Sequence, residues 1–175
     1  MTWSHEFVEL DSSIHDRQSF DCGEESLNWF LQSQAARHMS AGVSRTLILP
    51  TANAASNGNY AICSLYTIAP GEIRRETLPP SQAKKLPHYP VPVFLIAQLA
   101  VDSSYQLRGL GKVTLIKALE KLWLVNAEMR AYAVIVDCLN AEARLFYEKF
   151  GFDYLCEHNG RDRLFLFMGT VAKLF

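Results

Sequence analysis

The apolar positions of this chain recur with two different periods, and these periods predict its strands and helices. Residues 6–10 alternate as a half-buried strand does, and residues 43–49 and 60–68 are rich in β-branched and aromatic residues. Residues 92–101 form a nearly continuous apolar run, which is typical of a strand buried on both faces. Further strands are predicted over residues 131–136, 152–156 and 164–169.

Helical spacing appears in three other segments. Residues 24–41 carry apolar side chains at helical intervals, and Gly42 is a natural C-terminal stop. Residues 110–125 place one apolar stripe opposite Lys117, Glu120 and Lys121, and residues 140–150 form a shorter helix. The resulting order predicts an α/β fold, with a mixed central sheet of six to seven strands and helices on both faces.

Two polar segments interrupt this pattern. Residues 50–59 are predicted to be an exposed loop between strands. Residues 70–92 hold most of the prolines and form a long excursion with a short helix near residues 81–85. An excursion of this length in a compact domain is usually functional or disordered.

Composition narrows the class of protein. The 175 residues suit a single domain over 1–175, and 49% hydrophobic with 20% charged residues is ordinary for a globular protein. The net charge of −1 argues against a uniformly basic nucleic-acid-binding surface, although it allows a local basic patch. Without an export signal or a bilayer-length apolar run, we expect a cytoplasmic protein with no membrane segment. The cysteines and histidines are dispersed, so we expect reduced thiols and no metal site.

The junction between residues 98 and 112 carries the most specific chemical signal. A strand runs into a glycine-bearing turn, with Gln106, Gly109 and Gly111, and then opens a helix. The first N–H groups of a helix and its dipole attract anions, and glycine lets a phosphate approach the backbone closely. Arg108 and Lys112 add positive charge. A dinucleotide-binding motif would need a third glycine, and a P-loop would need a Gly-Lys-Ser/Thr ending, so both are disfavoured.

Tyr147 is the candidate acid. On a helix from Asn140, the residues Asn140, Arg144 and Tyr147 fall in one sector beside the apolar stripe. A tyrosine there is either a packed rim residue or a phenol that faces a cleft. If an amine attacks a thioester, a tyrosine with a pKa near 10 can protonate the leaving sulfur. A backbone N–H on the 99–101 strand, where the sheet must splay, would stabilise the oxyanion.

These two segments together resemble the acetyl-CoA-dependent N-acetyltransferases of the GNAT superfamily, whose Gln/Arg-x-x-Gly-x-Gly/Ala motif is matched by Gln106, Gly109 and Gly111. More narrowly, the chain resembles the GNAT toxins of bacterial type II toxin–antitoxin modules. Seven segments carry this resemblance in the family order: Phe20-Asp21-Cys22-Gly23, Leu27…Phe30-Leu31, Gly42-Val43-Ser44-Arg45-Thr46, Tyr66-Thr67-Ile68-Ala69-Pro70, Leu86-Pro87…Tyr89-Pro90-Val91-Pro92, Leu99-Ala100-Val101-Asp102 and Phe146-Tyr147-Glu148-Lys149-Phe150-Gly151-Phe152.

The resemblance implies an enzyme that transfers acetyl from acetyl-CoA to the α-amino group of aminoacyl-tRNA and so blocks translation. It implies that Tyr147 is catalytic. The expected partners are a ribbon-helix-helix antitoxin, promoter DNA through the antitoxin complex, and in addition a second copy in a homodimer. The expected cofactor-binding residues are Leu99, Ala100, Val101, Gln106, Leu107, Arg108, Gly109, Leu110, Gly111, Lys112, Asn140 and Tyr147. Two alternatives stay open: a GNAT enzyme that acetylates a protein N-terminus or a small amine, and a non-catalytic acyl-CoA-binding module.

The chain departs from the family pattern at three places. Leu107 stands where glycine is common, Gln98 where arginine is frequent, and Ser64-Leu65 where Gly-Tyr is frequent. The change at Leu107 should matter little if its side chain faces solvent. The change at Ser64-Leu65 lies near the expected acceptor pocket, so amino-acid specificity does not transfer from relatives.

Six basic residues are candidates for tRNA binding, and ordinary solvated charges are an equal alternative. They are Arg37, Arg45, Arg74, Arg75, Lys84 and Lys85. The two pairs in the 70–92 excursion are the better candidates, because Tyr89 beside them could stack on the exposed 3′ end.

Overall fold

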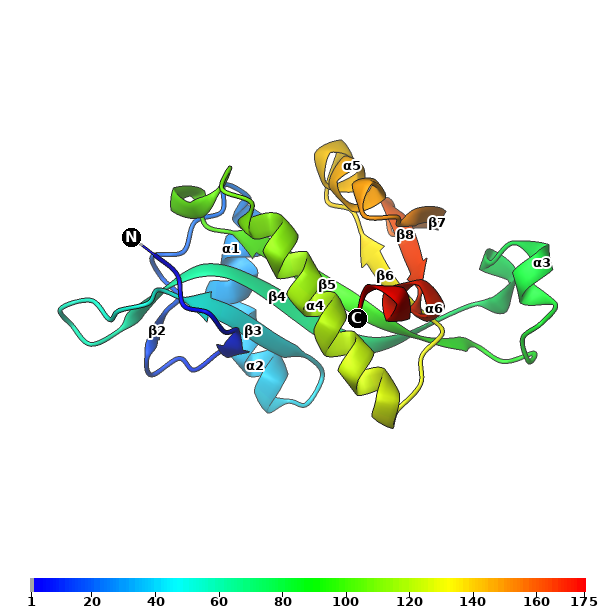
Figure 1. The fold of residues 1–175 in the computed structure, drawn as a ribbon, viewed down its shortest axis with the longest axis horizontal. Helices are drawn as coiled ribbons and strands as arrows, with labels where there is room; N and C mark the ends of the chain where they lie inside the picture. Colours follow the sequence, from blue (N-terminus) through cyan, green and yellow to red (C-terminus); the bar gives the residue numbers. More distant parts are fainter. Residues whose placement is uncertain (1) are drawn as a thin grey trace. The chain divides into compact units, whose positions relative to one another are not determined.

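The computed structural model describes residues 2–175, which form eight strands and several helices (Figure 1). The strands are β1 (Val8–Glu9), β2 (His15–Asp16), β3 (Arg45–Pro50), β4 (Tyr60–Ile73), β5 (Val91–Val101), β6 (Ala133–Asp137), β7 (Asp153–His158) and β8 (Arg161–Phe167). The helices are α1 (Glu25–Trp29), η1 (Phe30–Gln34), α2 (Ala35–Ser40), η2 (Arg75–Thr77), α3 (Pro80–Ala83), η3 (Ser103–Tyr105), α4 (Leu110–Glu128), α5 (Ala141–Lys149), α6 (Met168–Val171) and η4 (Ala172–Leu174).

The strands form one mixed sheet in the order β1-β3-β4-β5-β6-β8-β7, and β2 pairs with the start of β4. The β3–β4 and β6–β8 pairs are antiparallel, whereas β5 and β6 are parallel. The expected α/β fold with a mixed sheet is confirmed. Because β1 and β2 are only two residues long, the six longer strands make up most of the sheet.

The chain divides into two compact units. The first unit holds the chain up to Ala69 together with Gln98–Ala118, and the second holds Pro70–Ala97 together with Leu119–Phe175. The strands β4 and β5 and the helix α4 each begin in one unit and end in the other.

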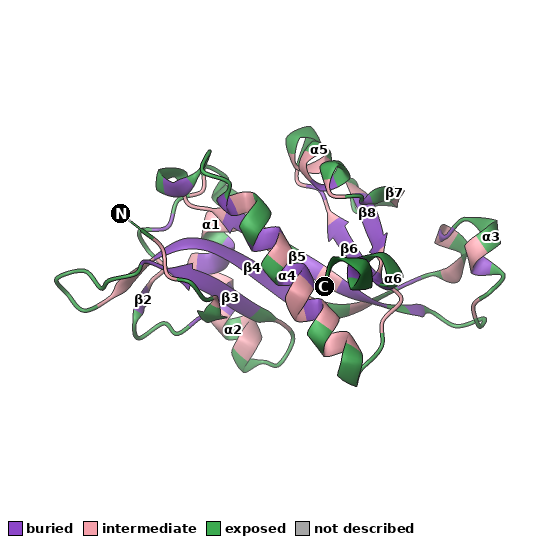
Figure 2. Ribbon diagram, viewed as in Figure 1, coloured by how far each residue is buried: buried purple, intermediate pink, exposed green. Residues whose placement is uncertain are grey.

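In the first unit, helices cover both faces of the sheet, whose strands are largely buried there (Figures 1 and 2). Ile48 and Ile62 pack with Phe30 and Leu31 of η1, whereas Leu49 and Cys63, the next residues along each strand, pack with Leu110 of α4 and its neighbours. Successive side chains of a strand point to opposite faces, and in this unit each face therefore has its own helix.

The helix predicted over residues 24–41 forms as three consecutive parts, α1, η1 and α2, of which η1 is a π-helical turn. Its buried residues include Phe30, Leu31 and Ala35, as the apolar spacing predicts. The helix ends where expected, because Gly42 adopts a left-handed conformation with φ of 77° and donates its N–H to the Met39 carbonyl.

In the second unit, the predicted excursion is shorter and more ordered than the sequence suggests. The strand β4 continues to Ile73 and β5 begins at Val91, so the connection covers residues 74–90. Leu78 and Ala83 are buried in a cluster with Val91 and Ile135. The excursion is therefore anchored on the strands, and the helix expected near residues 81–85 forms one residue earlier as α3.

Several short elements, among them β2, η3 and α6, were not predicted from the sequence. The strand β2 is too short to show alternation, and the turns η3 and α6 consist of three and four residues. Among residues 2–175, none of the helices combines the length and the apolar character that a bilayer crossing requires.

Candidate active site

The turn between β5 and α4 has the backbone form that an anion site needs. Leu107 and Gly109 both have positive φ, at 62° and 80°, and no atom lies within 4 Å of the place where a Cβ of Gly109 would stand. The helix α4 then begins at Leu110, and its earliest N–H hydrogen bond runs from Val113 to the Gly109 carbonyl. The N–H groups of residues 110–112 are in the first turn, where no helical carbonyl can accept them.

The two cations of this turn, Arg108 and Lys112, have different surroundings. The Arg108 guanidinium carbon lies 4.8 Å from the ring centroid of Trp3 and 5.7 Å from that of Tyr105. These aromatic faces hold the charge over the turn. Lys112 is exposed on the first turn of α4. Both charges are thus available to an anion, and the residues present fit the pyrophosphate of a coenzyme A.

Leu107 has an exposed fraction of 106%, so its side chain faces solvent completely. The condition stated for this departure from the family pattern, a side chain that faces solvent, is therefore met. It remains a leucine in a left-handed conformation, which L-residues adopt at a cost of about 1–2 kcal/mol.

Gln106 has a role that the motif alone does not reveal. Its side-chain Nε2 donates to the Cys22 carbonyl at 2.9 Å and to the Val101 carbonyl at 2.8 Å. An amide nitrogen has two hydrogens, and the chain itself takes both. Gln106 was predicted to bind the cofactor, but the structure uses these donors to hold the turn.

The strand segment Leu99–Val101 enters the turn from β5. Pairing between β5 and β6 is confined to Phe94 with Val134 and Leu95 with Ile135, although both strands continue. Ala100 packs on the cluster around η1, whereas Val101 packs on the cluster that contains Leu110. The end of β5 therefore has backbone groups that no β6 residue pairs with, as a splayed sheet requires.

Tyr147 lies in the second unit, on α5. Its ring centroid is 5.3 Å from that of Phe146 and 5.4 Å from that of Phe152. Gly151, with φ of 91°, ends the helix and turns the chain so that Phe152 comes back to the tyrosine. Within residues 146–152, the rings of Phe146 and Phe152 thus pack against two sides of the Tyr147 ring.

Burial keeps the Tyr147 hydroxyl protonated. The side chain is buried, and desolvation is the main cause that raises its pKa above the usual range, with the nearby Cys138 thiol acting in the same direction. Burial also raises the pKa of Cys138, to about 11. Both groups are therefore neutral at physiological pH, and the tyrosine can donate a proton.

The predicted sector of Asn140, Arg144 and Tyr147 does not form as expected. Asn140 is not the first helical residue: its backbone is extended and its Oδ1 accepts the Ala143 N–H at 2.9 Å as an N-cap. Arg144 donates to Asp162 at 3.0 Å and stacks on Tyr154. The predicted sector was wrong because it placed Asn140 inside the helix. Asn140 instead precedes the helix, and its side chain accepts the Ala143 N–H, which has no carbonyl partner within the helix.

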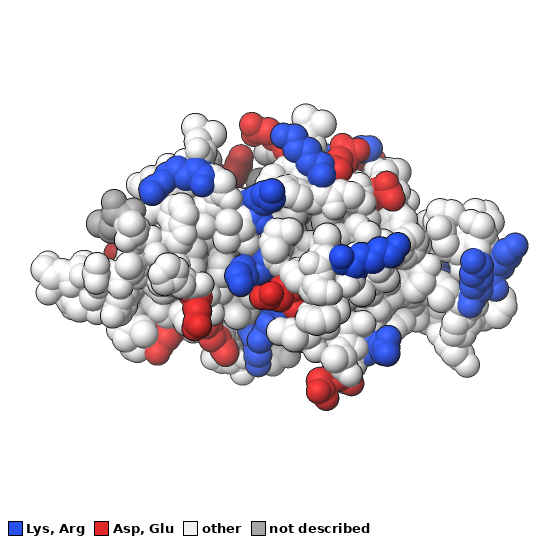
Figure 3. All heavy atoms as spheres, viewed as in Figure 1, with Lys and Arg blue, Asp and Glu red and all other residues white. Residues whose placement is uncertain are grey.

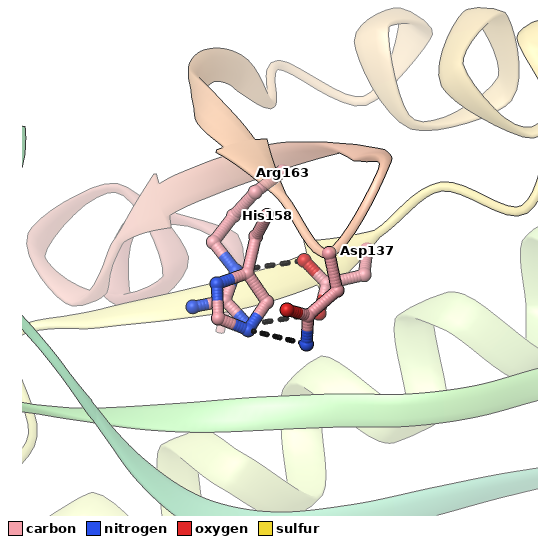
Figure 4. Close-up of polar contacts among 4 residues, drawn as sticks. Asp137, His158 and Arg163 are labelled. Carbon is pink, nitrogen blue, oxygen red and sulfur yellow. Dashed lines mark hydrogen bonds and ion pairs between the residues drawn. The ribbon is translucent and has the colours of Figure 1, made fainter.

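An ion pair missed by the sequence analysis lies directly before Cys138. Asp137 at the end of β6 faces Arg163 of β8, which donates to it through Nε at 2.7 Å and Nη2 at 2.8 Å (Figure 4). Arg163 is buried, and the hydrogen bond to Asp137 is the main cause that raises its pKa. These residues are 26 positions apart, so no local pattern could have indicated the pair.

The six basic candidates lie in different units. Arg37 and Arg45 are exposed in the first, and the other four lie around α3 in the second, where Figure 3 shows basic side chains gathered. Of these four, Arg75 is used internally: its Nε donates to the carbonyls of Ala83 and Leu86 at 2.7 and 3.3 Å. Lys84 and Lys85 are exposed, and Tyr89 beside them is 70% exposed. Across residues 2–175, no group of three or more His, Cys, Asp or Glu side chains is placed to hold a metal ion.

Comparison with known proteins identifies the family. Residues 81–152 match the acetyltransferase (GNAT) family. A tRNA-acetylating toxin of Mycobacterium tuberculosis (strain ATCC 25618 / H37Rv) is 32% identical over 142 residues, which cover 81% of each protein. Two similar structures are AtaT complexed with acetyl-methionyl-tRNAfMet (28% identity, TM-score 0.85, 97% of this chain and 98% of that one) and AtaTR bound with AcCoA (30% identity, TM-score 0.83, 97% of each).

The β5–α4 turn, the buried tyrosine after it in the chain and these matches agree with one another. The chain belongs to the acetyltransferase (GNAT) family, among the relatives of the tRNA-acetylating toxins.

Proposed function

We propose that this protein is the toxin of a type II toxin–antitoxin system and that it acetylates the α-amino group of aminoacyl-tRNA, which blocks translation. The observation that carries the proposal is the turn at Leu107–Lys112, followed in the chain by a tyrosine that burial keeps protonated. The similarity to a tRNA-acetylating toxin and to AtaT complexed with acetyl-methionyl-tRNAfMet supports the choice of acceptor.

Acetyl-CoA fits the β5–α4 turn. Its pyrophosphate would meet the N–H groups of residues 110–112 and the charges of Arg108 and Lys112, with Gly109 allowing a close approach. The Leu99–Val101 segment would supply a backbone N–H to the carbonyl oxygen of the acetyl group. When bound, acetyl-CoA supplies an activated acetyl thioester with a thiol leaving group.

Tyr147 would act as the general acid. Its hydroxyl holds a proton at physiological pH, because burial disfavours the phenolate. An α-amino group has a pKa of about 8, so a useful fraction is neutral without a strong base. The required proton donor is thus present, and a dedicated general base is not needed.

The acceptor side would use exposed cations. Lys84, Lys85 and Arg74 are exposed near α3, whereas Arg75 is committed to the local backbone. Exposed Lys and Arg bind phosphates with a strong dependence on salt. Arg37 and Arg45 are further candidates in the first unit.

We propose a ribbon-helix-helix antitoxin as the partner, contact with promoter DNA through that complex, and a cytoplasmic place of action, where charged tRNA is used. We also treat residues 1–175 as one catalytic domain, because β4, β5 and α4 each run through both compact units.

The experiment that tests the function is incubation with labelled acetyl-CoA and total charged tRNA, followed by identification of the acetylated species. We expect label on the aminoacyl end of tRNA and none on deacylated tRNA. Label on a protein N-terminus or a polyamine instead would replace the acceptor. Binding of acetyl-CoA without transfer to any amine would indicate a non-catalytic acyl-CoA-binding module.

A further inference from the structure

The β5–α4 turn is tied to a segment about eighty residues earlier in the chain. The motif Phe20-Asp21-Cys22-Gly23 lies against residues 101–106, within the first unit. The mechanism proposed above assigns no role to this motif. The hydrogen bonds between this motif and residues 101–106 indicate a role in holding the turn.

Asp102 is the first link. Its carboxylate accepts the Ser104 N–H at 2.9 Å through one oxygen and the Asp21 N–H at 3.0 Å through the other. It therefore connects the start of the turn with the earlier segment. Ser103 adds two bonds in the opposite direction, since its N–H and its hydroxyl both donate to the Asp21 carbonyl at 2.8 Å.

Gln106 is the second link, four residues further along the turn. Its amide joins the Cys22 carbonyl to the Val101 carbonyl, so both ends of the 101–106 segment are fixed on the same support.

The Phe20–Gly23 segment, which supports the turn, is itself held by several hydrogen bonds. The Asp21 carboxylate accepts the Gly23 N–H and the Asn28 side chain, both at 2.9 Å, and Asn28 in turn accepts the Cys22 N–H at 2.9 Å. Asn28 belongs to α1 and anchors the segment to that helix. Hydrogen bonding lowers the pKa of the Asp21 carboxyl, with the Gly23 N–H as the largest cause.

We propose that Asp102 and Gln106 are positioning residues for the cofactor, which hold the Leu107–Lys112 turn on the Phe20–Gly23 segment in its anion-binding form. This inference rests on the proposed use of the turn for acetyl-CoA. The physical reason is preorganisation: a turn with two positive φ angles, one at a leucine, is not the preferred form of a free chain. Without its support, the turn must be ordered when the cofactor binds, and affinity falls.

The decisive variant is Asp102→Asn. Removal of a negative charge near a polyanion site should strengthen coenzyme A binding if the carboxylate acts only through its charge. Positioning predicts the opposite, because an amide keeps one acceptor oxygen and turns an NH₂ group toward a backbone donor. We expect calorimetry with coenzyme A to give a Kd raised about tenfold, the equivalent of one or two lost hydrogen bonds.

Two further variants complete the design. Gln106→Met removes both donors without adding charge and should also raise the Kd about tenfold. Asp16→Asn is the matched control: Asp16 accepts hydrogen bonds from Ser19 in the same part of the chain and does not touch the turn. Its Kd should stay within about twofold of the parent protein. In both variants of the turn, the KM for acetyl-CoA should rise by a larger factor than kcat falls, which separates positioning of the cofactor from a general loss of structure.

The outcomes separate this inference from the proposed function. Unchanged or tighter coenzyme A binding by folded Asp102→Asn and Gln106→Met proteins would overturn it, as would an equal loss in Asp16→Asn. If Asp102→Asn does not fold, Gln106→Met decides. Failure to acetylate charged tRNA, with the expected differences in coenzyme A affinity, would contradict the proposed acceptor and leave the positioning role supported.

Discussion

At the scale of single residues, burial determines what Tyr147 can do. Helical geometry places it at the edge of an apolar stripe, but the aromatic contacts with Phe146 and Phe152 enclose its ring. A phenol in such a place resists ionisation, because the phenolate would lose its hydration. The same packing therefore keeps the hydroxyl in the protonated form that the proposed general-acid role requires.

We expect Tyr147→Phe to keep the fold and the affinity for acetyl-CoA while kcat falls by roughly 10²–10⁴-fold, as for loss of a general acid. The raised pKa also has a pH consequence. The active, protonated form persists where a free tyrosine ionises near pH 10, so the parent kcat should show no falling limb below about pH 10. Steady-state kinetics on both proteins would check this, and near-parent turnover by a folded Tyr147→Phe protein would remove the tyrosine from the mechanism.

Residue conformation also changes how Gly109 should be tested. A bulky side chain there would stand where a phosphate is proposed to approach the backbone. With φ of 80° and open space around the Cβ position, the cost of a side chain is backbone strain rather than collision. A β-branched residue would therefore lower both the stability of the protein and its affinity for the cofactor. Variants that leave φ of Gly109 untouched, such as those of Asp102 and Gln106, test cofactor binding without this backbone strain.

At the scale of elements, the α3 segment separates structural from available cations. Arg75 holds the end of α3 through two carbonyls, and Arg74 is 3.8 Å from Glu76 in an exposed pair. Lys84 and Lys85 are the exposed pair that can meet phosphates. If all four basic residues of this segment were changed to glutamate, a weaker tRNA affinity could result either from lost phosphate contacts or from unfolding of the segment that Arg75 holds.

We therefore expect the double variant Lys84→Glu and Lys85→Glu to raise the KM for charged tRNA steeply at unchanged acetyl-CoA affinity. Each lost phosphate contact should flatten the salt dependence by about one unit of slope. A matched double reversal at exposed Arg130 and Lys173 serves as the control. Kinetics at two salt concentrations would decide, and equal KM values and slopes in the two double variants would place tRNA on another face.

The ion pair between β6 and β8 makes a prediction about stability. Arg163 keeps 10% of its side chain exposed and Asp137 keeps 30%, so loss of the carboxylate leaves the more buried charge unpaired. We expect Asp137→Ala to cost about 3 kcal/mol of unfolding free energy, and Arg163→Met, which keeps the apolar stem, about 1 kcal/mol less. Urea unfolding would measure both.

The control for that pair lies on α5. Arg144 and Glu148 are 3.5 Å apart but more exposed, at 34% and 40%. Glu148→Ala should therefore change the unfolding free energy by no more than about 0.5 kcal/mol. A larger cost for Glu148→Ala than for Asp137→Ala would contradict the argument from burial.

At the scale of the whole molecule, the net charge of −1 hides an uneven distribution. Figure 3 shows basic side chains over the α3 segment on the face that it displays. Binding of a polyanion depends on this local arrangement rather than on the total. A net charge of −1 is therefore compatible with a tRNA substrate.

The sequence alone determined the features that arise from nearest neighbours along the chain. Periodicity predicted the six longer strands and the helices over residues 24–41, 110–125 and 140–150, within a few residues of their observed ends. Gly42 indicated the C-terminal end of the first helix, where the chain adopts a left-handed conformation. The residue pattern around Gly109 also predicted the turn that opens the helix α4, because a glycine-bearing turn and the helix start are local features of the chain.

Only the tertiary structure decided which polar groups remain available for function. Gln106, Arg75 and Asn140 look like free ligands in the sequence, yet each is committed to backbone groups of the fold. The support of the turn by Asp21 and the pairing of Asp137 with Arg163 join residues 81 and 26 positions apart. Contacts at such separations leave no local pattern. The sequence therefore indicated the candidate chemistry, and the fold determined which polar side chains are already bonded to its own backbone.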